Sequence, residues 1–188
     1  MGKRALLVRS ASLLLIAAAS LTVRAADPTL EIGTVMPDGT VYAGLSMDTG
    51  KPLFVPAPGR RMPDGTIYAG ISPDSDKALY TTPQDAPAVF SWVRAQKYCR
   101  ALSASRQRDW HVPSLGELAV LFTNRASIGS FNETGYVNNA PGYYWSSLEV
   151  GDASAWGQRF NDGYHEDLSK TQDSLVRCVR SSYDKAWN

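Results

Sequence analysis

The segment SWVRAQKYCRALS, residues 91–103, fixes the first helix of the chain and the environment of one of its cysteines. Trp92, Ala95, Cys99 and Leu102 recur at intervals of three and four residues, which is the spacing of one helix face. The serine that opens the segment is a favoured N-cap residue. We therefore predict a helix over this whole segment, with its cysteine on the buried face.

The first 25 residues have the three parts of a secretory signal peptide. Basic residues precede an apolar run at 12–21, and small residues at Val23 and Ala25 mark a cleavage site. The run is too short for the ~20 residues of a membrane span, and no cysteine follows it to carry a lipid anchor. We expect cleavage after Ala25 and a mature chain that is periplasmic, secreted or at the cell surface.

Removal of this leader takes four basic residues away and turns the formal net charge of +1 into −3. Nucleic-acid binding needs a strongly basic face, so we expect no nucleic-acid partner. No second long apolar run follows, and we expect no transmembrane segment after cleavage. The oligomeric state is left open by the sequence.

The chain contains two cysteines, Cys99 and Cys178. In an exported protein an even number of cysteines favours a disulfide, and two are too few for a structural zinc site. The alternative is a pair of free buried thiols. We predict the disulfide, which would join the first helix to a C-terminal strand.

A 26-residue repeat occupies the region between the leader and the first helix. Residues 36–54 recur as 62–80, and the core of the repeat reads MPDGTVYAGLS in the first copy and MPDGTIYAGIS in the second. Pro-Asp-Gly is typical of turns, and the flanking segments have the composition of short strands. We predict a small β-hairpin repeat region within 26–87 that serves as a stalk or a docking element.

Five aspartates of the repeats invite a second interpretation, namely calcium binding. No Asp-x-Asp-x-Asp-Gly loop with a distal glutamate is present. We favour turns for all of them, and we expect no metal and no cofactor. These residues are Asp38, Asp48, Asp64, Asp74 and Asp76.

The second half of the chain mixes one further helix with short strands. The sequence SLGE at 114–117 is a capping box, which predicts a helix over 114–124. Asn161-Asp-Gly163 predicts a hairpin turn. Long loops rich in Gly, Asn and Ser follow the helix, and the fold class is therefore α+β. The predicted strands lie at 143–147, 155–160 and 175–180.

Several local motifs of this half, in this order and spacing, resemble the Lcl C-terminal domain family over residues 88–181. The motifs are YC at 98–99, DWHVPS at 109–114 followed by EL at 117–118, YWSS at 144–147, AW at 155–156, Phe160 with DG at 162–163, and VRCVR at 176–180. The family is named for a collagen-like bacterial adhesin, and many members are domains of unknown function. The resemblance implies a C-type-lectin-like domain, with two helices packed on short antiparallel strands, and a binding role. Residues 182–188 remain as a tail.

The resemblance does not extend to a calcium-dependent sugar site. Animal C-type lectins use a Glu-Pro-Asn or Gln-Pro-Asp loop and a Trp-Asn-Asp strand, and this chain has neither. The segment 160–162, Phe-Asn-Asp, is only a faint counterpart of the second element. We therefore expect ligand binding that does not need calcium.

Catalytic signals are weak. His111 stands at a helix entrance and His165 in a turn, and we favour a structural role for the first and a solvated loop position for the second. None of the common hydrolase, zinc-protease or nucleotide-binding motifs occurs. We expect no enzyme. A hydrolase would have to place one histidine against a carboxylate and a nucleophile.

Aromatic and amide side chains in loops are the candidates for ligand binding, because flat rings and planar amides suit sugars and because loops often carry function. We assign Trp145 and Trp156 to the core. The candidate site residues are Tyr136, Asn138, Asn139, Tyr143, Asn161, Asp162 and Tyr164.

The sequence thus favours an exported, non-enzymatic binding module whose ligand is a glycan, a polysaccharide or a protein surface. The alternative is a structural or assembly component of a cell-envelope complex, with the repeats as docking element. An apolar patch or an open strand edge on the repeats would favour the alternative.

Overall fold

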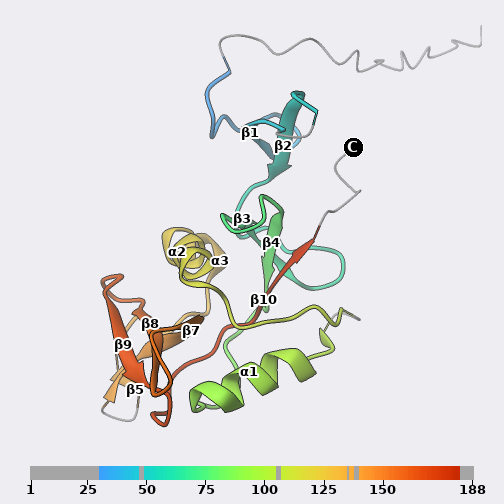
Figure 1. Ribbon diagram of the computed structural model, residues 1–188. Helices are drawn as coiled ribbons and strands as arrows, with labels where there is room; N and C mark the ends of the chain where they lie inside the picture. Colours follow the sequence, from blue (N-terminus) through green and yellow to red (C-terminus); the bar gives the residue numbers. More distant parts are fainter. Residues whose placement is uncertain (1–29, 47–48, 105–106, 135, 138–139, 183–188) are drawn as a thin grey trace, which may run out of the picture. The chain divides into compact units, whose positions relative to one another are not determined.

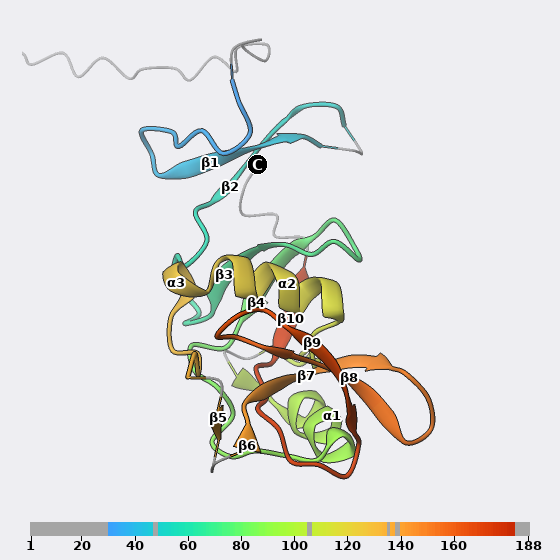
Figure 2. The same cartoon turned by 90° about the vertical axis from the view of Figure 1, so that its left-hand side faces the viewer.

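The computed structural model describes residues 30–46, 49–104, 107–134, 136–137 and 140–182 (Figure 1; Figure 2). In the described residues, four strands are followed by three helices and then by six further strands, all in small antiparallel sheets. The predicted α+β class is confirmed. The signal peptide and the end of the tail lie outside the described residues. Across the described ranges, no helix has the length and apolar character that a membrane span requires.

The two sequence repeats fold into two hairpins. Strand β1 (Thr40–Leu45) pairs with β2 (Pro52–Pro56), and β3 (Ile67–Ile71) pairs with β4 (Ala78–Thr81), both antiparallel. Each pairing contains a register shift at the same place in the repeat. Equal sequence therefore gives equal local structure in the two copies.

The aspartate of Pro-Asp-Gly makes the same turn in each repeat. Asp38 Oδ1 accepts hydrogen bonds from the backbone N–H of Thr40 at 2.9 Å and from its hydroxyl at 2.7 Å. Asp64 Oδ1 accepts the same two bonds from Thr66 at the same distances. The turn role of these two carboxylates is confirmed. Asp48 lies outside the described residues. Among the residues that are described, no group of three acidic, histidine or cysteine side chains could hold a metal ion.

The second hairpin is built into the rest of the protein. Strand β10 (Val179–Ser182) pairs with β4 on the side away from β3, so that the sheet order is β10-β4-β3. Ile67, Ala69 and Leu79 of this hairpin lie in the main apolar cluster with residues of the second helix. The boundary predicted at residue 87 is thus crossed by a sheet pairing, because the last strand returns to the second repeat.

Both predicted helices are confirmed to within two residues. Helix α1 is Trp92–Ala101, with Cys99 buried, and α2 is Leu115–Thr123. The capping box is complete: the Ser114 hydroxyl accepts from Glu117 N at 3.0 Å, and the Glu117 carboxylate accepts from Ser114 N at 3.1 Å. A further short helix, α3 (Arg125–Ile128), follows directly and was not predicted.

A second sheet has the order β7-β8-β9, formed by Tyr143–Glu149, Ser154–Arg159 and His165–Ser169. A two-residue pair, β5 (Tyr136–Val137) and β6 (Ala140–Pro141), precedes it. The hairpin turn predicted at Asn161-Asp-Gly163 joins β8 to β9. Strand β9 was not predicted, because three successive exposed polar residues at its start hide the usual alternation.

The two faces of this sheet are covered by different helices. Tyr143, Trp145 and Leu168 share an apolar cluster with the buried face of α1. Tyr144 and Phe160 belong to the cluster that contains α2 residues. The core position of Trp145 is confirmed, but that of Trp156 is wrong.

Trp156 is only half-buried and belongs to none of the apolar clusters of the described residues. It lies opposite Asp167 of the edge strand β9. The strand pattern around it is correct, but the polar edge strand supplies no apolar neighbour at this position.

The C-terminal segment 174–182 joins the two sheets. Leu175 exchanges backbone hydrogen bonds with β7, where Trp145 N donates to its carbonyl at 3.0 Å and its own N–H donates to Tyr143 O at 2.8 Å. Four residues later the chain enters β10, and Val179 bridges to His111. The strand predicted at 175–180 therefore consists of two separate pairings in one extended segment.

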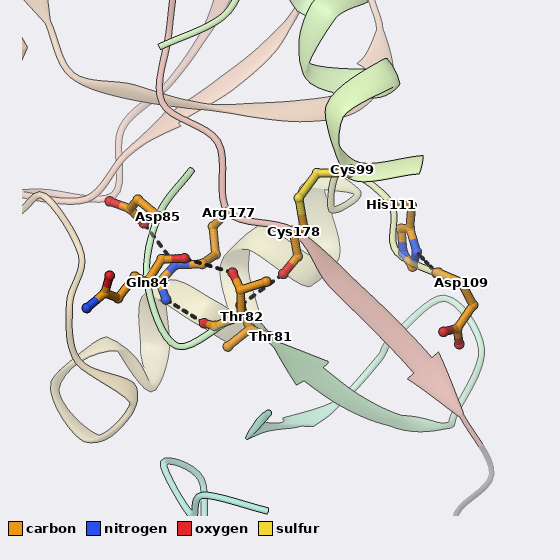
Figure 3. The surroundings of a disulfide bond; sticks show 9 residues. All are labelled: Thr81, Thr82, Gln84, Asp85, Cys99, Asp109, His111, Arg177 and Cys178. Atoms are coloured by element: carbon orange, nitrogen blue, oxygen red, sulfur yellow. Dashed lines mark hydrogen bonds and ion pairs between the residues drawn. A yellow bond between two sulfur atoms is a disulfide. The ribbon is translucent and has the colours of Figure 1, made fainter. Parts of the chain in front are cut away.

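The predicted disulfide between Cys99 and Cys178 is present, and both cysteines are buried (Figure 3). It links α1 to the segment that precedes β10. The carbonyl of Cys178 also accepts hydrogen bonds from the Thr81 hydroxyl at 3.1 Å and from Thr82 N at 3.2 Å. The crosslink therefore lies against the second repeat as well as the first helix.

A buried arginine lies one residue before this disulfide (Figure 3). Arg177 Nε is 2.8 Å from Asp85 Oδ1, and Arg177 Nη1 donates to Thr82 O at 2.6 Å. Arg177 Nη2 donates to Ser130 O at 2.6 Å and to Gly129 O at 3.1 Å. The guanidinium is thus fully enclosed by a carboxylate and three backbone carbonyls from two loops.

The second oxygen of Asp85 extends this network. It accepts from the Tyr144 hydroxyl at 2.6 Å, and that hydroxyl accepts from Asn132 N at 2.6 Å. Burial, reinforced by the Asp85 charge, raises the pKa of Tyr144, so the hydroxyl stays protonated and donates. The ring of Phe131 lies 4.0 Å from the centre of the Arg177 guanidinium. Four segments of the chain therefore meet at one ion pair.

We predict that the disulfide supplies a large part of the stability. Replacement of Cys99 and Cys178 by alanine should lower the free energy of unfolding by about 4 kcal/mol, because a long loop is no longer closed in the unfolded chain. The melting temperature should fall by about 10 °C. Thermal unfolding of the double variant measures this, and titration of denatured, unreduced wild-type protein should find no thiols. An unchanged melting temperature would contradict the prediction.

The buried ion pair leads to a second prediction. Arg177→Ala leaves Asp85 buried without its counter-charge and should cost about 3–5 kcal/mol. Arg108→Ala, which removes an exposed arginine, is the matched control and should cost less than about 0.5 kcal/mol. Adding Asp85→Ala to Arg177→Ala should cost much less than Asp85→Ala alone. Additive losses in urea unfolding would show that the two side chains act independently.

Candidate functional site

The turn between β8 and β9 brings three of the predicted site residues together: Asn161, Asp162 and Tyr164. All three are exposed. The turn is closed by Arg159, whose N–H donates to Tyr164 O at 2.9 Å and whose carbonyl accepts from Gly163 N at 2.9 Å. The result is a short, well-bonded loop at the tip of the sheet.

Glycine is required at position 163 for two reasons. Its φ is +80°, a conformation that side chains disfavour. A Cβ at this position would also lie 2.7 Å from the ring of Phe122 on α2. The turn therefore packs directly on the helix, which limits its freedom.

An arginine holds the tip rigid. Arg159 binds both carboxylate oxygens of Asp162, with Nε at 3.0 Å and Nη2 at 2.5 Å. Hydrogen bonds from Arg159 and from Tyr164 N lower the pKa of Asp162. The guanidinium lies between two aromatic rings, 5.6 Å from the centre of Tyr143 and 5.5 Å from that of Tyr164. Tyr164 thus has one ring face supported, while 56% of the residue stays exposed.

Tyr143 begins a strand, as predicted, but its side chain is not available to a ligand. It lies in β7 and is 2% exposed, because its ring packs in the α1 cluster. Its hydroxyl donates to Glu166 at 2.6 Å, and burial together with this carboxylate raises the pKa of Tyr143 to about 12. Tyr143 therefore positions Glu166 and supports Arg159, but its ring cannot stack on a ligand.

The other three predicted site residues cannot be compared with the tip. Tyr136 belongs to β5, and its side chain is not among those described; Asn138 and Asn139 lie outside the described residues. Arg159 and Glu166 were not among the predicted site residues. Arg159 could have been found from its spacing, because it stands three residues before the aspartate of an Asn-Asp-Gly turn. His165 is exposed on β9, beside the tip.

A second polar site was not predicted at all. It is a cleft of about 280 Å³ between the β3–β4 turn, the start of α2, β7 and β10. Its lining residues are Ser72, Asp74, Ser75, Lys77, His111, Ser114, Glu117, Ser147 and Ser181.

Glu117 is the centre of this cleft and is 3% exposed. Its Oε1 accepts from the hydroxyls of Ser72 at 2.8 Å and Ser181 at 3.1 Å. Its Oε2 accepts from Ser114 N at 3.1 Å and lies 3.0 Å from His111 Nε2. A buried carboxylate with four hydrogen-bond partners is fully satisfied.

This arrangement favours the protonated form of His111. Its Nε2 faces the Glu117 carboxylate and its Nδ1 lies 3.2 Å from Asp109 O, so both nitrogens face acceptors (Figure 3 shows the second contact). Burial opposes the charge, but the bonds to Glu117 and Asp109 outweigh it and raise the pKa of His111. The same ion pair, against the opposing effect of burial, lowers the pKa of Glu117. The structural role favoured for His111 agrees with this ion pair.

The cleft contains a histidine, a carboxylate and serines, which are the parts of a hydrolase site, but they are connected differently. In a catalytic triad the serine hydroxyl donates to the histidine. Here the hydroxyls of Ser72 and Ser181 donate to Glu117, and the nitrogens of His111 are occupied. Among the described residues of the cleft, no serine–histidine pair is set up for nucleophilic attack.

The fold and these sites define a small α+β domain closed by one disulfide. The family model of the Lcl C-terminal domain matches residues 72–180, more than half of the chain. The chain belongs to this family, as its motifs predict. The match begins before β4, so the family domain includes the strand of the second repeat that pairs with β10.

Other comparisons add little. No curated protein matches the chain. Among solved structures, the crystal structure of botrocetin is similar with a TM-score of 0.39 and 10% sequence identity, and the alignment covers 55% of this chain and 91% of that one. A likeness of this size does not establish a common fold.

The His111–Glu117 pair leads to a prediction of pH dependence. The pKa of His111 is raised above 6.5, so its contribution to stability is complete below that pH and is lost as the pH rises through the folded-state pKa. The pKa of Glu117 is lowered below 4.5, so its contribution is lost only as the pH falls through the folded-state value. Stability from the pair should therefore be greatest between these limits, at about pH 5–6.

Melting curves between pH 5 and 8 test this. The melting temperature of the wild type should decline toward pH 8, and His111→Asn should make this decline smaller by about 2 °C. The effect is small because His111 is partly exposed. The matched control is His165→Asn, which changes the exposed histidine and should leave the decline as it is. An equal effect of the two variants would contradict the assignment.

Proposed function

We propose that this protein is an exported, non-enzymatic binding module with a C-type-lectin-like domain, and that it holds a glycan or a protein surface at the β8–β9 tip. The observation that carries the proposal is the exposed ring of Tyr164, fixed by Arg159. A rigid aromatic ring on a loop loses little entropy when a ligand binds.

The lectin-like fold is supported by family membership and by the arrangement of the elements. Two helices cover opposite faces of a small antiparallel sheet, and the disulfide joins α1 to the segment before β10. Between α3 and β7, residues 129–142, the described positions form one further element, the short β5–β6 pair. This order is the one that the family resemblance implies.

Sugar recognition is supported by the chemistry at the tip. The C–H face of a pyranose can stack on the free face of Tyr164, while its hydroxyls need planar acceptors and donors nearby. Asn161 offers an amide, and Glu166, at the start of β9, offers carboxylate oxygens. Both neighbours lie within three residues of Tyr164 along the chain.

Export is supported by the signal-peptide pattern of residues 1–25 and by the disulfide, since disulfides persist in oxidising compartments. The mature chain beginning at Ala26 is therefore the form to assay.

A glycan array probed with the mature protein, with and without a chelator, tests the proposal. Tyr164→Ala should weaken binding about tenfold, because truncating an aromatic anchor costs more than 1 kcal/mol. Val150→Ala, an exposed apolar change at the other end of the same sheet, is the control and should bind as wild type. The chelator should have no effect. Binding that is unaffected by Tyr164→Ala would overturn the proposed site.

One observation favours the alternative, an assembly component of a cell-envelope complex. Ile32 and Val35, just before the first repeat, and Leu45 within it are each more than half exposed. Such side chains can dock on a partner. If this is the main function, polar substitution of Leu45, and not Tyr164→Ala, should release the protein from its envelope complex.

A further inference from the structure

The cleft around Glu117 has a defined hydrogen-bond polarity. Glu117 is ionised, because its pKa is lowered, and an ionised carboxylate can only accept. The hydroxyl hydrogens of Ser72 and Ser181 are therefore both directed at Glu117 Oε1. Ser72 is fully buried, so only the partly exposed Ser181 can offer the lone pairs of its oxygen to a ligand.

Donors are also present in the same cleft. The Ser114 hydroxyl accepts from Glu117 N, so its own hydrogen is available. Ser75 lines the same cleft; its hydroxyl oxygen is buried and has no hydrogen-bond partner among the described residues. Ser147 contributes a further hydroxyl to the lining. Fixed acceptors and available donors thus alternate over a short distance.

The charges of the cleft balance. Glu117 is paired with the His111 imidazolium, and the lining contains one further acid, Asp74, and one further base, Lys77. A cleft with no net charge does not favour an ion over a neutral ligand. Its volume of about 280 Å³ lies just below the ~300–1,000 Å³ of pockets for drug-sized molecules.

We propose that this cleft binds a neutral polyhydroxylated ligand about the size of a single sugar unit. Hydroxyl groups of such a ligand both donate and accept, which matches the mixed polarity of the serine lining. The ligand class rests on the proposed function, but the site is distinct from the Tyr164 tip and is formed by other elements. A glycan that reaches both would be held at two points.

The first repeat shows that the site depends on tertiary context. Ser46 is the counterpart of Ser72, since the two serines end the 11-residue core of the repeat in its two copies. In the first copy the hydroxyl accepts from Thr49 N, at 3.3 Å, whereas the Ser72 hydroxyl donates to Glu117. Ser46→Ala is therefore a matched control for changes on the second turn.

Nuclear magnetic resonance of the isotope-labelled mature protein tests the proposal with named probes. The probes are the methyl glycosides of glucose, galactose and mannose, with inorganic phosphate as the ionic comparison. At least one glycoside should shift the amide signals of 72–77 and 114–117 and saturate with a Kd of about 1–10 mM, whereas phosphate should not. Absence of any shift in these segments up to about 100 mM, or a stronger response to phosphate, would overturn the proposal.

Two variants locate the site. Asp74→Ala removes an acceptor at the rim, and Ser147→Leu fills the cleft; each should raise the Kd at least about threefold. Ser46→Ala and Tyr164→Ala should leave these shifts unchanged. Melting temperatures establish that each variant is folded. A response that vanishes with Tyr164→Ala would assign the ligand to the tip alone, which would support the proposed function but refute this second site.

Discussion

The buried Arg177–Asp85 ion pair is the constraint on which the rest of the structure depends. A charge enclosed by protein is tolerated only when its partners are close and complete. Here the partners are a carboxylate, three carbonyls and the ring of Phe131. They come from two loops, one that precedes α1 in the chain and one that follows α3. Those loops cannot move independently, because any displacement would leave the guanidinium unsatisfied.

Three successive residues then connect this ion pair to the rest of the fold. Arg177 fixes the loops, Cys178 is bonded to α1, and Val179 begins the strand that pairs with the second repeat. This explains why two nearly identical hairpins have different fates. The second copy has β10 beside it and α2 over its face, whereas the first presents Leu45 to solvent.

Both candidate binding surfaces rest on a carboxylate held by a cation. At the tip, Asp162 fixes Arg159 and so supports the exposed ring. In the cleft, Glu117 bonded to His111 orients the serine hydroxyls. In each case the charged pair is not the proposed contact with the ligand. It fixes neighbouring neutral groups, and these are proposed to contact the ligand. Preorganised neutral groups of this kind suit a hydroxyl-rich ligand.

The sequence by itself determined the features that depend on neighbours along the chain: the helix face that carries Cys99, the complete capping box of α2, the Asp-Thr turns of the repeats, and the motifs of the family. It also gave the disulfide, because there was only one pair to form. Only the tertiary structure decided that β4 pairs with β10, that Tyr143 is buried and that Glu117 gathers serines from distant segments. These outcomes rest on contacts between residues far apart in the chain, such as Ser72 and Ser181 with Glu117, which no local periodicity encodes.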